Sequence, residues 1–107
     1  MTKHLPTQIS SILHNLIPKL RANLLIYRIY LFGSFSKGTY SKDSDIDIAI
    51  FLSECNNNLK SVYKNAVKIC SEYGKDIQVQ VFNQDELLEP AGIVEEIIEF
   101  GTDITEI

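Results

Sequence analysis

The sequence has no tryptophan, two cysteines and two histidines among its 107 residues. Cys55 and Cys70 are too few for the disulfide framework of a small secreted domain, and they lack the spacing of a zinc site. His4 and His14 have no cysteine or carboxylate partner at ligand spacing, so we interpret both as surface or helix residues. The cysteine content therefore predicts a cytoplasmic protein with two free thiols.

Long hydrophobic runs and an excess of basic residues are also missing. No segment approaches the roughly 18 apolar residues that span a membrane, and the N-terminus lacks the features of a secretory signal. Ten Lys and Arg against fourteen Asp and Glu give a formal net charge of -4. A nucleic-acid binder would need a basic face, so we expect neither membrane nor direct nucleic-acid contact. A nucleotide is not excluded, because a metal ion can supply positive charge.

The composition is that of an ordinary folded domain. Hydrophobic residues make up 45% of the chain and charged residues 22%, which argues against disorder. The length suits one modest core, and neither a repeat nor a linker interrupts it. We therefore expect a single domain over residues 1–107.

Hydrophobic periodicity predicts an alternation of helices and strands. Thr7 is expected to cap the first helix and Pro18 to kink or end it, residues 56–58 give a helix-start signal, and Asn83 is expected to cap a short helix. The predicted elements are a helix at 7–20, strands at 26–32 and 46–52 separated by a loop, a helix at 59–70, a strand at 76–82, helices at 83–88 and 93–100, and a strand at 103–107. This order indicates an α/β (α+β) fold with a small mixed β-sheet flanked by helices.

Two carboxylates interrupt an otherwise apolar strand in GSFSKGTYSKDSDIDIAI, residues 33–50. Buried carboxylates are costly unless a cation or a fixed hydrogen-bond network compensates them. Strand alternation places Asp45 and Asp47 on one face, while Ile46 and Ile48 point to the core. Two same-face carboxylates suit a hard divalent cation such as Mg²⁺.

A third carboxylate is expected from the strand at 76–82. If this strand lies beside the first, Asp76 completes a three-carboxylate site, and two bridged metal ions can then support an in-line displacement. The register leaves an alternative open, in which Gln78 or Gln80 holds the third position and weakens metal binding. Asp76 also has a simpler reading as the polar entrance to a strand.

The loop that begins with Gly33 and Ser34 predicts a phosphate site. Glycine lets the backbone approach a ligand closely, and a serine hydroxyl with exposed backbone N–H groups can bind an anion. Ser44 is a further candidate phosphate contact. Together with the carboxylates, this loop predicts binding of a nucleoside triphosphate and metal.

The acidic residues also allow two simpler interpretations. A calcium loop of the EF-hand type requires glycine at its sixth position, where Ile48 stands. A solvated acidic turn is the other reading, and it is our interpretation of Asp43.

The spacing resembles the signature of the nucleotidyltransferase superfamily related to DNA polymerase β, and the short length is similar to its minimal members, the MNT proteins. The matching positions are Gly33, Ser34, Ser36, Gly38, Asp45 and Asp47. The resemblance implies that Gly33 and Ser34 bind nucleotide and that Asp45 and Asp47 are metal-binding and catalytic. The family usually has alanine at the position of Ser36 and arginine at that of Lys37, and lysine cannot make a bidentate phosphate contact.

The resemblance also implies a function. We expect a metal-dependent transfer of AMP from ATP, or of another nucleoside monophosphate, to an acceptor hydroxyl, with two Mg²⁺ ions or Mn²⁺ and with Asp45, Asp47 and Asp76 as catalytic ligands. A HEPN-family toxin is the expected partner and acceptor, which would make this chain an antitoxin, and a homo-oligomer is the other way to complete the site. The alternative is an inactive binding module that neutralises a partner by contact. A small-molecule transferase is the third hypothesis, and it would need a further helical domain.

Overall fold

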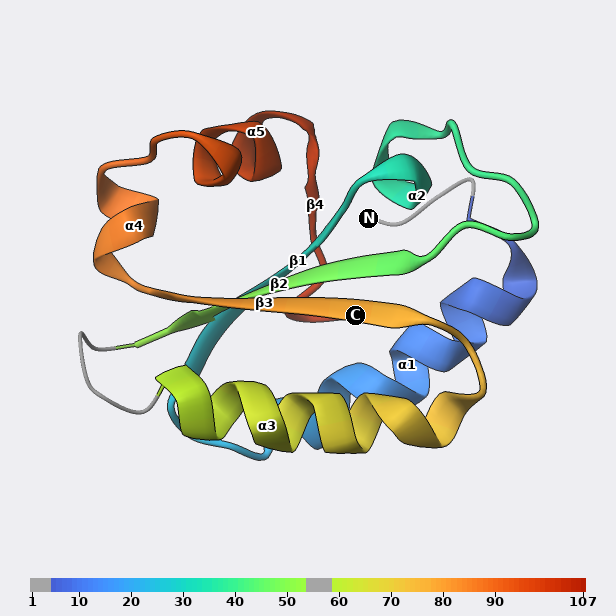
Figure 1. Ribbon diagram of the computed structural model, residues 1–107, viewed down its shortest axis with the longest axis horizontal. Coiled ribbons are helices and arrows are strands. Elements are labelled where there is room, and N and C mark those ends of the chain that lie inside the picture. The colour runs from blue at the N-terminus through green and yellow to red at the C-terminus, as the bar shows by residue number, and fades with distance from the viewer. Residues whose placement is uncertain (1–4, 54–58) are drawn as a thin grey trace.

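A mixed sheet forms the centre of the computed structural model, which describes residues 5–53 and 59–107 (Figure 1). This arrangement confirms the expected α/β class with a small mixed sheet flanked by helices. The elements of the described residues are α1 Thr7–Arg21, β1 Ile26–Phe32, α2 Ser34–Lys37, β2 Ile46–Leu52, α3 Leu59–Cys70, the 3₁₀ helix η1 Ser71–Tyr73, β3 Ile77–Asn83, α4 Asp85–Leu88, α5 Ile93–Phe100 and β4 Thr102–Asp103.

The strand order is β3-β2-β1-β4, with β1 antiparallel to both β2 and β4 and with β2 parallel to β3. These directions bring the end of β1 and the beginnings of β2 and β3 to one end of the sheet, beside α2 (Figure 1). In the register, Asp47 of β2 lies between Phe32 of β1 and Gln78 of β3. The polar residues singled out in the sequence therefore gather at this end.

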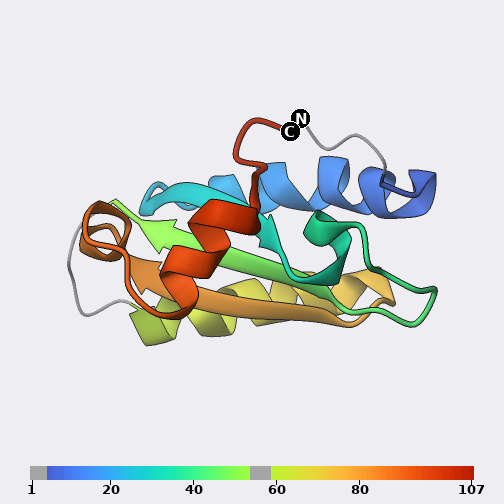
Figure 2. The same cartoon turned by 90° about the horizontal axis from the view of Figure 1, so that it is seen from above.

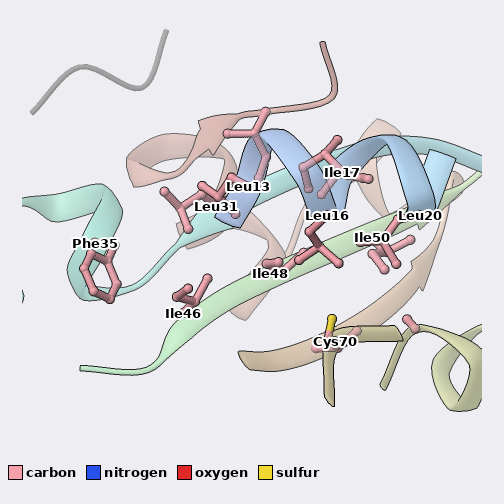
Figure 3. Close-up of a cluster of buried hydrophobic side chains, with 14 of the residues drawn as sticks. Leu13, Leu16, Ile17, Leu20, Leu31, Phe35, Ile46, Ile48, Ile50 and Cys70 are labelled. Atoms are coloured by element: carbon pink, nitrogen blue, oxygen red, sulfur yellow. The ribbon is translucent and has the colours of Figure 1, made fainter. Parts of the chain in front are cut away.

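Helices cover both faces of the sheet. α1 and α3 lie on one face and α4 and α5 on the other (Figures 1 and 2). Apolar side chains of α1 and α3 pack against Ile46, Ile48 and Ile50 of β2 (Figure 3). On the opposite face, Ala49 and Phe51 pack against α5. Truncating a side chain in such a core typically costs 2–5 kcal/mol.

Burial on both faces explains why β2 is so apolar in sequence. Every residue of β2 is buried except Asp47, which is half-buried. A strand covered on both faces has no solvent side on which polar residues would alternate. The single carboxylate inside this strand is therefore an exception that the packing does not require.

α1 differs from its prediction at both ends. Pro6 occupies the N-cap position without a side-chain cap, and Thr7 is already helical, so the expected Thr7 cap is wrong. Proline suits this place because its fixed φ precedes a helix easily. Pro18 lies inside the helix, which continues to Arg21. Burial of Ile17 and Leu20 against the sheet holds the last turn in place despite the missing N–H of Pro18.

Three other local predictions need correction. Residues 34–37, expected as loop, form the short helix α2. Asn83 ends β3 instead of capping α4, and its backbone N–H donates to Glu86 Oε2 over 3.2 Å. β4 is limited to Thr102–Asp103. Beyond it, Ile104 N–H still donates to the Ile29 carbonyl over 2.9 Å, but the Ile29 N–H donates to Thr105 Oγ1 over 2.9 Å instead of to a backbone carbonyl.

Some predictions fall on residues that the structure does not describe. The helix-start signal at 56–58 lies there, as do Cys55 and His4. Within residues 5–53 and 59–107, none of the helices combines the length and hydropathy needed to cross a bilayer.

Candidate active site

The carboxylate of Asp47 lies directly against the backbone of Gly33. Gly33 follows β1 with φ 74° and ψ -152°, a conformation open essentially to glycine alone. A Cβ at this position would stand 3.1 Å from Asp47 Cγ and closer still to Oδ2. The glycine is therefore required twice, for its backbone conformation and for the space that the carboxylate occupies.

Asp45 and Asp47 lie close enough to repel each other. Burial raises the pKa of the Asp47 carboxyl above its ordinary value, and the negative charge of Asp45 raises it further. Both side chains are half-buried at the start of β2. A cation bound between them would relieve this repulsion, and carboxylate oxygens are the donors that Mg²⁺ prefers. The residues thus fit the metal that the sequence predicted.

Asp76 and Gln78 are the two candidates for the third ligand position beside Asp45 and Asp47. Asp76 is exposed and precedes β3, and its carbonyl accepts from Ile46 N–H over 2.9 Å. Gln78 is the register partner of Asp47 and shares its face of the sheet. Among residues 5–53 and 59–107, no group of three His, Cys, Asp or Glu side chains is placed to hold a metal ion. Asp76 as third ligand therefore stays a prediction, and Gln78 is the side chain next to Asp47.

Gln80 lies farther along the sheet. Its register partner is Ala49, two residues beyond Asp47 on β2. Of the two glutamines that the sequence left open, Gln78 is thus the nearer to the acidic pair.

Ser34 begins α2 immediately after Gly33. Two later residues of this helix, Ser36 and Lys37, contact α5. Ser36 Oγ donates to the Phe100 carbonyl over 2.9 Å. Lys37 Nζ lies 3.0 Å from Glu96 Oε1 and 5.5 Å from the centre of the Phe100 ring. Glu96 thus pairs with the lysine that stands at the arginine position of the family signature.

Ser44 shapes the turn that leads into Asp45. Its Oγ accepts from Ser41 N–H over 2.8 Å, and its N–H donates to the Ser41 carbonyl over 3.1 Å. Such serine turns stabilise loops locally. The phosphate contact expected of Ser44 stays a prediction beside this structural role.

A pocket of about 150 Å³ opens between Gly33 and α5. Its walls are mainly apolar, from Phe32, Ile93, Ile97 and Phe100, and Lys37 and Glu96 also line it. Sites for whole drug-sized ligands usually enclose about 300–1,000 Å³. This pocket therefore has room for one ring or side chain beside Gly33, and no motif in the sequence pointed to it.

Comparison with known proteins gives the same picture. Residues 14–106 match the family described as Polymerase beta, Nucleotidyltransferase. Protein adenylyltransferase MntA of Shewanella oneidensis is 36% identical over 72 residues, which are 67% of this chain and 47% of MntA. The chain thus spans about half the length of this curated relative.

Solved structures share the fold. A toxin–antitoxin complex crystallised with AMP-PNP is 32% identical, with a TM-score of 0.53 over 83% of this chain and 69% of that chain. A mutant of the MntA–HpeT toxin–antitoxin is 32% identical, with a TM-score of 0.57 over 85% of this chain and 70% of that chain. A protein of Sulfolobus solfataricus described as a nucleotidyltransferase shares the fold at 17% identity, with a TM-score of 0.58 over 96% of this chain and 90% of that chain.

The family match covers most of the chain and includes the glycine-serine turn and the acidic pair. The chain therefore belongs to the polymerase beta nucleotidyltransferase family, as an MNT-type nucleotidyltransferase.

Proposed function

We propose that this chain transfers AMP from ATP to a hydroxyl group on a partner protein of the HEPN family, and that it acts as the antitoxin of that partner. The observation that carries this proposal is the contact between the Asp47 carboxylate and Gly33, with Asp45 beside it. The relatives support the substrates: one is a protein adenylyltransferase, and one is a toxin–antitoxin crystallised with AMP-PNP.

The residues divide the work between phosphate and metal. Gly33 leaves the backbone open to the triphosphate, and the Ser34 hydroxyl donates a hydrogen bond to a phosphate oxygen. Asp45 and Asp47 would hold Mg²⁺ or Mn²⁺, which when bound neutralises charge on the phosphates. The acceptor oxygen attacks the α-phosphorus, the bond to pyrophosphate breaks, and the exposed carboxylate of Asp76 is the candidate acceptor of the hydroxyl proton.

Labelled ATP tests this proposal. The chain is incubated with Mg²⁺, ATP labelled at the α-phosphate and the HEPN-family partner, and label on the partner is measured. We expect Asp45→Asn and Asp47→Asn to lower the transfer rate at least a hundredfold. Asp43→Asn is the matched control, because Asp43 is exposed in the loop that leads to Asp45 and the substitution removes the same negative charge. Equal label transfer by Asp47→Asn and Asp43→Asn would contradict the catalytic assignment.

The register of β3 favours a second candidate function. Because Gln78 lies beside Asp47, the site has a neutral amide where a third acid next to Asp47 would stand. This arrangement suits a module that binds its partner, and neutralises it by contact, without transferring a nucleotide. An Asp45→Asn/Asp47→Asn double variant separates the two functions. It should still neutralise the partner if contact suffices, and it should fail if AMP transfer is required.

A further inference from the structure

A second cavity lies at the same end of the sheet but on the other face from Asp47. It is open to solvent, has a volume of about 570 Å³ and is lined by the first turn of α1, by Phe35 and Tyr40, and by Lys42 and Lys75. Phe35 belongs to the core cluster of α1 and α3, whereas Asp47 shares its strand face with Ala49, which packs in the α5 cluster. The cavity is therefore separate from the acidic pair.

The cavity is basic in an acidic protein. Of the described residues that line it, two are lysines and none is acidic. In residues 5–53 and 59–107, neither lysine has a carboxylate within ion-pair distance, although four other basic residues do. Ammonium groups without a protein counter-charge are suited to a phosphate.

Lys75 is held in position before any ligand arrives. Its Nζ donates to the Lys42 carbonyl over 3.2 Å and lies 5.7 Å from the centre of the Phe35 ring. The Phe35 ring stacks on Tyr40 with centroids 4.9 Å apart and planes 17° apart. A cation fixed beside an aromatic pair offers both a charged and a flat apolar contact, and fixing it in advance reduces the entropy lost on binding.

We propose that this cavity binds a nucleoside monophosphate as a second, non-catalytic ligand, with the phosphate at Lys42 and Lys75 and the base against the apolar wall. The volume lies within the range of small-molecule sites. Cations and aromatic rings together match an anion that carries a flat ring. The ligand would contact α2 through Phe35, and the same helix begins at Ser34 on the side of the proposed triphosphate site. The site goes beyond the proposed function and does not depend on it.

Binding of AMP in EDTA tests the proposal, because chelation removes the metal that the acidic pair needs. Isothermal titration of AMP is compared between the wild-type chain, Lys42→Ala/Lys75→Ala and the matched control Lys60→Ala/Lys64→Ala, whose two lysines are exposed on α3. We expect the Lys42→Ala/Lys75→Ala variant to weaken AMP binding about a hundredfold or more, because it removes both charged hydrogen-bond donors that would contact the phosphate. The control should bind as wild type, and equal weakening in both would overturn the proposal.

Two further measurements locate the ligand and identify its parts. Amide NMR shifts on AMP addition should concentrate at Phe35, Tyr40 and Lys42, and shifts confined to Gly33 and Ser34 would overturn the proposal. Inorganic phosphate and adenosine should each bind more weakly than AMP. If phosphate alone binds as tightly as AMP, the base contributes nothing and the nucleotide assignment is wrong. Asp45→Asn/Asp47→Asn should bind AMP as wild type does, which separates this site from the failure or success of the transferase proposal.

Discussion

Replacing Gly33 by alanine should cost the fold more than the same change at any open turn. Two effects add at this position. The conformation of Gly33, φ 74° and ψ -152°, is strained for alanine by about 1–3 kcal/mol. The new methyl group would also push the Asp47 carboxylate away, and overpacking of this kind typically costs about 1–3 kcal/mol. We therefore expect Gly33→Ala to lower the free energy of unfolding by roughly 2–6 kcal/mol.

Gly74 supplies the matched control. Its φ of 64° also favours glycine, but a Cβ there would meet no atom within 4 Å. Gly74→Ala should therefore cost only the left-handed backbone, about 1–2 kcal/mol. Urea denaturation followed by circular dichroism measures both variants. With a slope of about 1–1.5 kcal/mol per molar urea for a chain of this size, the extra cost of overpacking at Gly33 should separate the two midpoints by roughly 1–3 M.

AMP transfer to the partner, measured below both unfolding transitions, separates the carboxylate from general stability. Gly33→Ala should lose transfer because Asp47 is displaced, whereas Gly74→Ala should keep it. The reasoning would be refuted if the two variants unfolded at the same urea concentration, or if Gly33→Ala transferred AMP at the rate of Gly74→Ala.

Three further outcomes are expected. Asp47→Asn should stabilise the metal-free chain by about 0.5 kcal/mol at pH 7, because like charges side by side are unfavourable. The pKa of the Asp47 carboxyl is raised in the folded chain, so the stability of the wild type falls as the pH rises through that pKa. Urea midpoints at pH 3.5 and pH 7 check the sign, and a variant less stable than wild type at pH 7 would contradict it. Burial raises the pKa of Cys70 to about 11, so in a Cys55→Ser background its thiol should react with a disulfide reagent at pH 8 at least a hundredfold more slowly when folded than in urea, and equal rates would exclude burial. Thr105→Val should destabilise the chain by about 1–3 kcal/mol, because the buried N–H of Ile29 loses its acceptor; thermal unfolding measures it, with Thr105→Ser as the variant that should keep most of the stability.

The sequence was sufficient for the fold because its periodicities are strong and agree with one another. The run at 46–52 and the alternation at 76–82 differ because β2 is covered on both faces while β3 is an edge strand with Gln78 and Gln80 exposed. The ends of individual helices and strands were less predictable. Pro18 stays helical because tertiary packing outweighs its lost hydrogen bond, and no single-sequence pattern shows that packing. β4 is short, and beyond it a threonine side chain replaces a backbone partner.

The candidate site was predictable in its residues and less so in its connections. Alternation correctly placed Asp47 on the face of β2 opposite Ile46 and Ile48, because a strand has only two faces. The contact between Asp47 and Gly33 depends on the register of β1 and β2, which only the folded sheet provides. The pairing of Lys37 with Glu96 joins residues 59 positions apart, and many exposed glutamates offer the same chemistry. Asp76 and Gln78 could not be separated, because a choice between them needs the register of β3.

Because β2 is buried on both faces, its length is tightly restricted in evolution. Deleting one residue inside β2 would exchange the two faces of the strand. Asp47 would then point into the hydrophobic core, and an isoleucine would take its place beside Gly33. No intermediate arrangement exists, since a strand cannot slide by half a residue. β2 should therefore accept only replacements of matching size, and neither insertions nor deletions.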